Sequence, residues 1–193
     1  VDRFFRWRLF MDYAGGPVTD LYPHAFTPVV HMLGVKFPAS VVASGGIYRY
    51  TYELREVPDT FNLLIDYPEK ITVALMGTQG NDNNGVGTAP AGSVGRAPLI
   101  RGWEATLTFA GNSIVLTPAD GSQKKAATFP IERGEDLVDF WKSFLDAVRA
   151  GKGPTASPMD LAYRTQTALL MGMAAWRAGR TARFDVQRET IVV

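Results

Sequence analysis

The segment TFNLLIDYPEKITVALMG, residues 60–77, carries the strongest β-sheet signal in the chain. Apolar side chains recur at every second position in both of its halves: Phe61, Leu63 and Ile65, then Ile71, Val73 and Leu75. A period of two is typical of a strand that buries one face. The two runs are separated by a turn sequence around Pro68. The segment therefore predicts an antiparallel hairpin with one buried face.

Other parts of the chain are also rich in β-forming residues and turn signals. The pair Gly45-Gly46 lies inside one such run and predicts a bulge or bend. The pair Gly111-Asn112 predicts the turn of a second hairpin. The further predicted strands lie within 38–52, 103–118, 125–131 and, as an edge strand, the tail 181–193.

A helix is predicted near the start of the chain, over 19–33. Thr19 or Asp20 is its expected N-cap, and Gly34 is its expected stop. Pro28 lies well inside this helix and should kink or split it, because proline has no N–H to donate to the preceding turn.

Two helices are predicted near the end of the chain. Apolar residues at helical spacing over 137–148 end at Gly151, and Ser157-Pro158 opens a helix that runs to Gly179. Residues 81–95 are rich in glycine and asparagine and predict a loop. No alternation of strand and helix appears, so the predicted fold class is α+β. We expect an open, mostly antiparallel β-sheet with helices packed on one face.

Composition narrows the possible partners. The chain has 193 residues, which suits one domain, and a net charge of +1, which gives no electrostatic footprint for nucleic acid. It has no cysteine for disulfides or thiolate metal sites, and no apolar run approaches the roughly 20 residues of a membrane helix. We expect neither nucleic acid nor membrane as a partner. A cysteine-free chain tolerates either redox environment; we favour a cytoplasmic location and leave an exported form open.

Common cofactor and nucleophile motifs are missing from the sequence. It has no G-x-G-x-x-G between a strand and a helix, no phosphate-binding loop, no G-x-S-x-G and no H-x-x-x-H pair. We therefore expect no cofactor-binding residues and no metal ligands in this chain.

Asp20 and His24 remain as a candidate pair for proton transfer. Side chains at i and i+4 share one face of a helix, and a carboxylate can fix the imidazole tautomer while the other ring nitrogen takes a proton. Gly15-Gly16 precedes the pair and permits a close approach of the backbone. The alternative is structural: Asp20 caps the helix and His24 packs.

Three segments resemble the Gfo/Idh/MocA oxidoreductase family. The first, RWRLFMDYAGGPVTDLYPHAFTPVVHMLG, has an aromatic lead-in, a glycine cluster and D-x-x-x-H before a helix that ends at Leu-Gly. The second, IRGWEATLTFAGNSIVLTP, is similar to the late hairpin of the family. The third, FWKSFLDAVRAGKGPTASPMDLAYRTQTALLMGMAAWRAGRTARFD, is similar to its closing helices and its final Gly-Arg and Phe-Asp pairs.

The resemblance implies a two-domain enzyme in which an N-terminal Rossmann domain holds NAD or NADP. Residues 1–193 would then be a single C-terminal domain for substrate binding and oligomerisation, and the Rossmann domain would be absent from this chain. The chain begins at Val1 rather than Met, which fits a piece of a longer protein. We expect the isolated chain to bind no nicotinamide cofactor and to be inactive.

The resemblance also assigns roles to residues. Asp20 and His24 take the positions of the catalytic pair. Apart from the resemblance, Arg8 and Tyr13 are our candidates for substrate binding. The segment departs from the family pattern at Tyr22-Pro23, which replaces small residues, and at Gly15-Gly16, which replaces a triple glycine. Thr27 and His31 replace a frequent Asp and Trp. These departures bear on which substrate is used.

The resulting hypothesis is the substrate-binding domain of a nicotinamide-dependent oxidoreductase that acts on a sugar or polyol. The alternatives are a non-catalytic carbohydrate-binding or assembly module of the same fold, and an NAD-dependent glycosidase. Leu64, Ala74 and Met76 should lie on the sheet face away from the helices, so we also expect a homo-oligomer that forms through that face.

Overall fold

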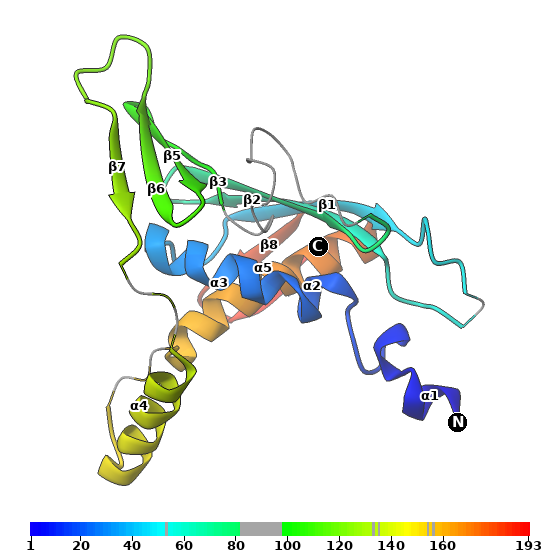
Figure 1. Ribbon diagram of the computed structural model, residues 1–193. Coiled ribbons are helices and arrows are strands. Elements are labelled where there is room, and N and C mark those ends of the chain that lie inside the picture. The colour runs from blue at the N-terminus through cyan, green and yellow to red at the C-terminus, as the bar shows by residue number, and fades with distance from the viewer. Residues whose placement is uncertain (53, 82–97, 133, 135, 154, 156) are drawn as a thin grey trace. The chain divides into compact units, whose positions relative to one another are not determined.

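The computed structural model describes residues 1–52, 54–81, 98–132, 134, 136–153, 155 and 157–193 (Figure 1). The chain forms two compact units. One comprises Val1–Asp82 and Met159–Val193, and the other comprises Asn83–Pro158. Each unit contains antiparallel strands and helix, so the predicted α+β class is confirmed. The strands form two separate sheets, one in each unit.

The first unit is built on a five-stranded sheet with the order β3-β2-β1-β8-β9. Its strands are β1 (Ser40–Gly46), β2 (Thr60–Tyr67), β3 (Ile71–Thr78), β8 (Ala182–Asp185) and β9 (Thr190–Val192). All neighbouring strands are antiparallel. The hairpin predicted for 60–77 is therefore confirmed as β2 and β3. The tail forms two strands rather than one, and β8 lies inside the sheet beside β1.

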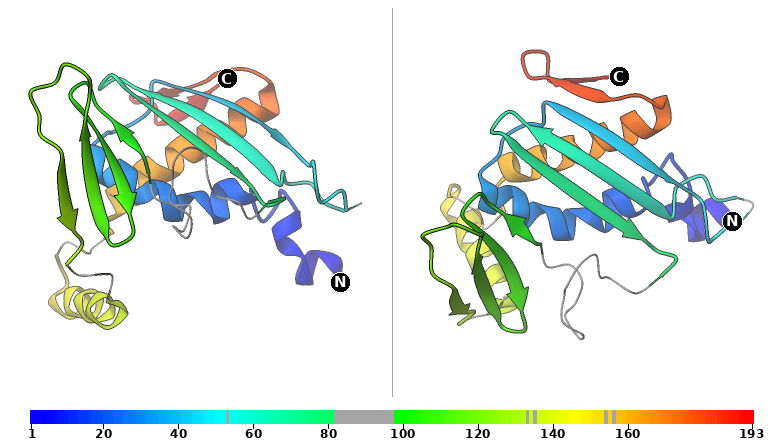
Figure 2. Two further views of the ribbon diagram at one scale, coloured as in Figure 1. Left: turned by 45° about the horizontal axis from the view of Figure 1, so that its top comes forward. Right: turned by 90° about the horizontal axis from the view of Figure 1, so that it is seen from above.

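Helices cover one face of this sheet. The helical elements of the unit are α1 (Asp2–Phe5), a 3₁₀ turn η1 (Trp7–Leu9), α2 (Pro17–Asp20), α3 (Tyr22–Leu33) and α5 (Met159–Ala178). Figure 2 shows the strands lying over α3 and α5. Phe61, Leu63 and Ile65 of β2 are buried against this layer, together with Leu169 and Met171 of α5. The predicted buried face of the hairpin is the face that packs on the helices.

Two close approaches fix the helices on the sheet. Gly172 of α5 lies against Leu63, and a Cβ at Gly172 would collide with Cδ2 of that leucine. The Tyr22 hydroxyl of α3 donates to the carbonyl of Phe61 and lies 3.3 Å from the carbonyl oxygen of Gly77. Burial raises the pKa of Tyr22, so this hydroxyl stays protonated.

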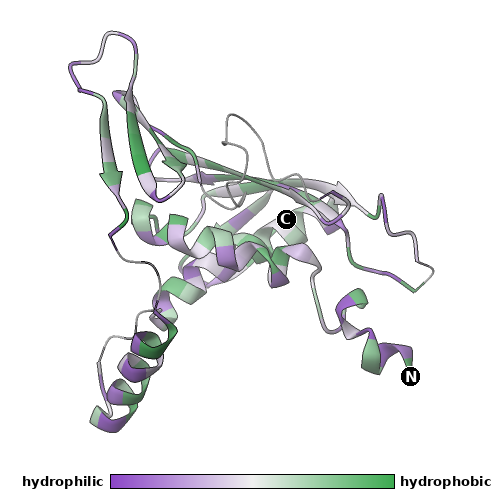
Figure 3. Cartoon of the chain, in the orientation of Figure 1, coloured by the Kyte–Doolittle hydropathy of each residue, from purple (hydrophilic) through white to green (hydrophobic). Residues whose placement is uncertain are grey.

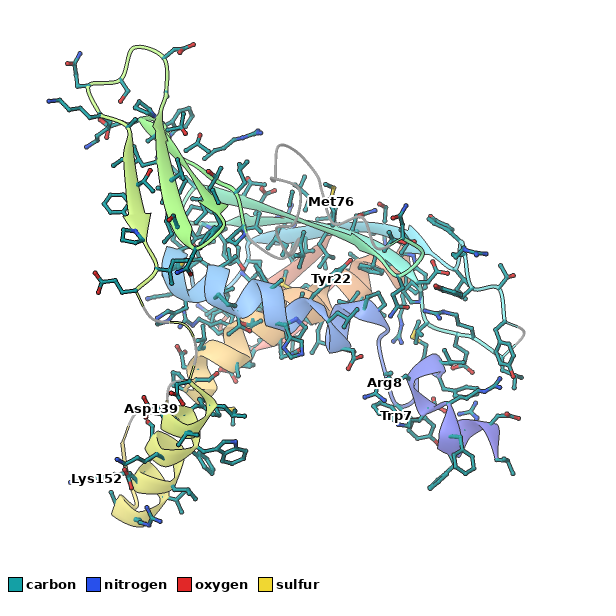
Figure 4. The ribbon with its side chains drawn as sticks, in the orientation of Figure 1. Trp7, Arg8, Tyr22, Met76, Asp139 and Lys152 are labelled. Atoms are coloured by element: carbon teal, nitrogen blue, oxygen red, sulfur yellow. The ribbon has the colours of Figure 1, made fainter. Side chains whose placement is uncertain are left out.

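The opposite face of the sheet is partly apolar and exposed. Val42, Leu64 and Met76 are 43%, 44% and 51% exposed. Val42 and Ala74 are the register partners of Leu64 on the two neighbouring strands. Figure 4 shows Met76 on the side of the sheet opposite to Tyr22. We call Val42, Leu64, Ala74 and Met76 the open-face patch.

The first helix breaks at a different residue from the one predicted. Leu21 separates α2 from α3, while Pro28 lies inside α3 without ending it. Asp20 is the last residue of α2 and not an N-cap, and no side chain caps α3. Pro23, in the first turn of α3, has no N–H to donate to the turn before it, which accounts for a new helix start here. Gly34 ends α3 in the left-handed conformation, as predicted.

The tyrosine-rich run after β1 is a loop rather than a strand. The register between β1 and β2 is continuous from Ser40 to Gly46, so the predicted bulge at Gly45-Gly46 is absent from this pair. Residues 47–52 and 54–59 then lie outside the sheet. The amides of Tyr48 and Tyr50 bind the Asp59 carboxylate and so cannot join a strand ladder. We call residues 47–52 and 54–59 the strap.

The described part of the second unit contains a four-stranded antiparallel sheet and one helix. The sheet order is β4-β5-β6-β7, with β4 (Ile100–Arg101), β5 (Ala105–Ala110), β6 (Ser113–Pro118) and β7 (Ala127–Pro130). The predicted turn at Gly111-Asn112 joins β5 to β6. The predicted loop over 81–95 lies outside the described residues, apart from Asn81.

Helix α4 (Leu137–Ala150) has a complete set of end signals. The Asp136 carboxylate accepts from the amides of Val138 and Asp139, and Gly151 ends the helix in the left-handed conformation. Figure 3 shows hydrophobic and hydrophilic stripes along α4. Among the helices of the described ranges, none combines the length and the apolarity of a membrane span.

Candidate substrate-binding site

A cavity of about 380 Å³ lies in the first unit, between the N-terminal segment, α2 and the strap. This volume is in the range of small-molecule sites. Its lining includes Trp7, Arg8, Tyr13, Asp20, Arg55 and Gln79. Two aromatic rings and several hydrogen-bonding groups therefore face one small space. Figure 4 shows Trp7 and Arg8 side by side on η1.

A second hollow, of about 260 Å³, lies at the end of α4 in the other unit. Of the described residues that line it, Lys152 alone is ionisable, beside Phe144 and Val148. This hollow lacks the convergent polar groups of the first cavity, so the first is the better candidate for chemistry.

Gly16 shapes the wall of the cavity. It has φ 64°, in the left-handed region, and it precedes Pro17 at the start of α2. A Cβ at Gly16 would lie 2.7 Å from the carbonyl oxygen of Pro58, so only glycine lets this turn lie against the strap. The Gly15 amide donates to the Thr19 hydroxyl at 2.9 Å. The close approaches of the glycine pair are thus to Pro58 and Thr19 of the same chain.

Arg8 and Asp20 form one side of the cavity. Nε of Arg8 lies 3.5 Å from Oδ2 of Asp20, and the guanidinium stacks 4.2 Å from the ring centroid of Trp7. Tyr13 is exposed and also lines the cavity. The structure therefore brings together three of the four residues singled out from the sequence: Arg8, Tyr13 and Asp20.

His24 lies apart from this group. It is an exposed residue in the first turn of α3, beyond the helix boundary at Leu21, and it is not among the lining residues. Among the described residues no hydrogen bond or ion pair joins it to Asp20, whose partner is Arg8. The pairing of Asp20 with His24 stays a prediction.

Arg55 is a cavity residue that the sequence did not single out. Nε donates to the carbonyl of Val57 at 2.8 Å, and one terminal nitrogen donates to the carbonyl of Pro58 at 3.1 Å and to Oε1 of Gln79 at 2.8 Å. These bonds tie the strap to the residue that follows β3. A single arginine in a loop has no local pattern that marks it as part of a site.

Asp59 holds the strap in place. It is fully buried, and its carboxylate accepts from the amides of Tyr48, Arg49 and Tyr50 and from the Thr60 hydroxyl, at 2.8–3.1 Å. Burial raises the pKa of Asp59, but these hydrogen bonds outweigh that effect and leave the pKa below its usual value. Asp59 is thus an ionised anchor that positions the Arg55 side of the cavity.

The described residues do not fit a nicotinamide dinucleotide. Such a cofactor needs a glycine-rich turn that leads from a strand into a helix N-terminus, and the described helices have no such turn before them. In the same part of the chain no three His, Asp or Glu side chains gather to hold a metal.

Comparisons with known proteins bear on the fold. Neither a scan against protein-family models nor a search of curated proteins gave a match. An NAD-binding protein from Listeria innocua superposes with a TM-score of 0.62 at 20% identity, over 92% of this chain and 50% of its own. The aldose-aldose oxidoreductase from Caulobacter crescentus, complexed with glycerol, gives 0.62 at 17% identity, over 92% and 50%.

A third solved structure is an oxidoreductase from Agrobacterium radiobacter in complex with NAD⁺, L-tartaric acid and magnesium. Its TM-score is 0.60 at 15% identity, over 90% of this chain and 52% of its own. The chain shares its fold with part of several oxidoreductases. It spans about half the length of the solved structures that it matches.

Proposed function

We propose that this chain is the substrate-binding part of an NAD(P)-dependent oxidoreductase of the Gfo/Idh/MocA type, acting on a sugar or polyol. The observation that carries the proposal is the cavity of the first unit, in a fold shared with half of several oxidoreductases. One of these is an aldose-aldose oxidoreductase, and another holds NAD⁺ and a hydroxy acid.

The cavity residues suit a polyhydroxylated ligand. Asp20 accepts hydrogen bonds from hydroxyl groups, Arg8 donates them, and the rings of Trp7 and Tyr13 pack against C–H surfaces. Because the described residues do not fit a dinucleotide, the proposal places the nicotinamide on another part of the full enzyme. Residues 1–193 would act there as a single domain that supplies substrate contacts.

Oxidation of a hydroxyl group also requires a base for its proton. Imidazole is the usual side chain for this near neutral pH, and we propose His24, with Asp20 supporting it. His24 is exposed and lies four positions after a cavity residue, so it is available to a substrate that extends beyond the lining.

The chain contains a matched control for this assignment. His24 and His31 are its two histidines, and both are exposed on α3. In the enzyme that carries the nicotinamide, His24→Ala should lower turnover about 10²- to 10⁴-fold, while His31→Ala leaves it unchanged. Asp20→Asn should have a smaller effect than His24→Ala. Both histidine variants should keep the thermal midpoint, since neither side chain is buried.

The experiment also tests the rival functions. NAD(P)H formation would be followed over a panel of sugars and polyols, and aryl glycosides would be assayed for release of the aglycone. Near-normal turnover in His24→Ala would refute the assignment of the base. Glycoside cleavage that requires NAD⁺ would identify a glycosidase, and sugar binding without any turnover would identify a non-catalytic module.

The open-face patch supports a second part of the proposal, a homo-oligomer that forms through the sheet. The patch spans β1, β2 and the edge strand β3, and polar residues such as Asp66 and Thr72 flank it. When two copies cover each other, these apolar groups leave water, and this burial favours association.

A further inference from the structure

We infer that the cavity selects an anionic polyol, a sugar acid whose carboxylate binds Arg55. This inference rests on the proposed function, because it names the substrate class of the same site. Arg55 then becomes the residue that determines specificity, and the carboxylate distinguishes the preferred ligand from a neutral sugar of the same length.

The charges that line the cavity do not cancel. The ionic lining groups are Arg8, Asp20 and Arg55. Arg8 and Asp20 lie 3.5 Å apart and offset each other, so Arg55 leaves one net positive charge. A ligand with one negative charge balances this cavity, which favours a carboxylate over a phosphate that carries closer to two.

The hydrogen bonds of Arg55 are all to neutral acceptors. Two are backbone carbonyls and the third is the side-chain oxygen of Gln79. Among the described residues no carboxylate contacts this guanidinium, and its second terminal nitrogen has no hydrogen-bond partner there. The three bonds hold the group in one orientation on the cavity wall. A fixed, partly buried guanidinium with a free N–H is well suited to bind a carboxylate.

Three described acidic residues near this end of the unit are already engaged. Asp12 and Glu56 both pair with Arg3, and Asp59 is occupied by amides of the strap. Arg6 and Arg49 add positive charge nearby. They stack on Tyr52 and Tyr50, and neither has a carboxylate partner within the described ranges. The surroundings therefore strengthen the attraction of the cavity for an anion rather than neutralise it.

The test compares ligands that differ in the carboxylate alone. Gluconate and sorbitol have the same carbon chain, as do glucuronate and glucose, and each would be titrated calorimetrically into the 193-residue chain. We expect each acid to bind about ten- to a hundredfold more tightly than its neutral counterpart, and this preference to weaken as salt is added. Acetate serves as the control for a simple anion, and glucose 6-phosphate for a phosphate.

Two variants assign the effect to one residue. Arg55→Gln should remove the preference for the acid, because it should weaken gluconate binding much more than sorbitol binding. Arg49→Gln is the matched control, because Arg49 lies in the same strap and stacks on the same Tyr50 but does not line the cavity. Arg55→Lys keeps the charge and should retain part of the preference. Thermal midpoints of the variants would check that the strap stays folded.

The outcomes separate this inference from the proposed function. Equal binding of acids and neutral sugars would overturn the inference and leave the proposed function intact. Absence of binding by all four sugars would overturn both. The inference also fails if acetate or glucose 6-phosphate binds as tightly as gluconate, or if Arg55→Gln weakens acids and neutral sugars alike.

Discussion

Leu64 and Ile65 are neighbours on β2, yet they lie in opposite environments. Ile65 is fully buried under α3 and α5, whereas Leu64 is 44% exposed on the open face. The two side chains have the same number of carbon atoms and the same strand backbone. The difference shows that the contribution of an apolar residue to the stability of this sheet depends on whether other elements cover it. The inner face stabilises the unit, and the open face is available to a partner.

The largest expected loss of stability comes from shortening a buried side chain on the inner face. Ile65→Ala should lower the free energy of unfolding by about 2–5 kcal/mol, since it removes buried methyl groups and leaves a cavity. Leu64→Ala on the same strand is the control and should change it by no more than about 0.5 kcal/mol. Urea unfolding of both variants measures the contrast, and equal losses would show that the two faces are equally covered.

The next effect concerns the closest contact on the inner face. Gly172→Ala places a Cβ against Leu63, which should cost about 1–3 kcal/mol and outweigh the gain of about 1 kcal/mol in helix propensity. In a Leu63→Ala background the same change should become neutral or stabilising, because the space is then free. A double-mutant cycle by thermal unfolding tests this, and a sign that does not change would argue against the contact.

A smaller effect is expected at the start of β2. Asp59→Asn should lower stability by about 1–2 kcal/mol at neutral pH, because the neutral amide is a weaker acceptor for the strap amides. Asp66→Asn, at the exposed end of the same strand, is the control and should change the stability very little.

The effect at Asp59 should also depend on pH. Its pKa is lowered in the folded state, so its contribution is present above about pH 4 and is lost as the pH falls through the folded pKa. Thermal midpoints of the two proteins should therefore converge in acid. A constant difference at every pH would mean that Asp59 acts through shape alone.

The smallest effect on folding should accompany a large effect on assembly. Leu64→Glu should leave the unfolding free energy of the monomer within about 0.5 kcal/mol, but it should shift an oligomer toward monomer, because it places a charge in the open-face patch. Light scattering at matched concentrations measures this shift. If the wild-type chain scatters as a monomer at high concentration, the open face has another role.

The sequence predicted the features that depend on neighbouring residues. The burial of Phe61, Leu63 and Ile65 follows from alternation alone, and Gly151 is a local stop signal. The predicted position of the helix break, at Pro28, was wrong. A proline leaves a carbonyl of the preceding turn without its partner, and the cost depends on how far that carbonyl lies from the helix start. Leu21 has no feature that marks it as a boundary.

Features that depend on distant residues were missed. Tyr48 and Tyr50 have strong strand propensity, but the Asp59 carboxylate binds their amides from outside the run. Arg8, Tyr13 and Asp20 were singled out and do line the cavity. Arg55 was not, since its place on the cavity wall comes from contacts with the end of β3, in a different part of the sequence.

The order of the strands also has a consequence for synthesis on the ribosome. Leu169 and Met171, which belong to the same buried core as Ile65, follow it by more than one hundred residues, and β8 comes later still. At about 5–20 residues per second, the β2–β3 hairpin emerges several seconds before its cover exists. During that interval the inner face is an exposed apolar surface on a nascent chain, covered only in part by the earlier helices α2 and α3. Slow translation between residues 80 and 158 would prolong that exposure. A chaperone that binds apolar strands would shield the face during this interval.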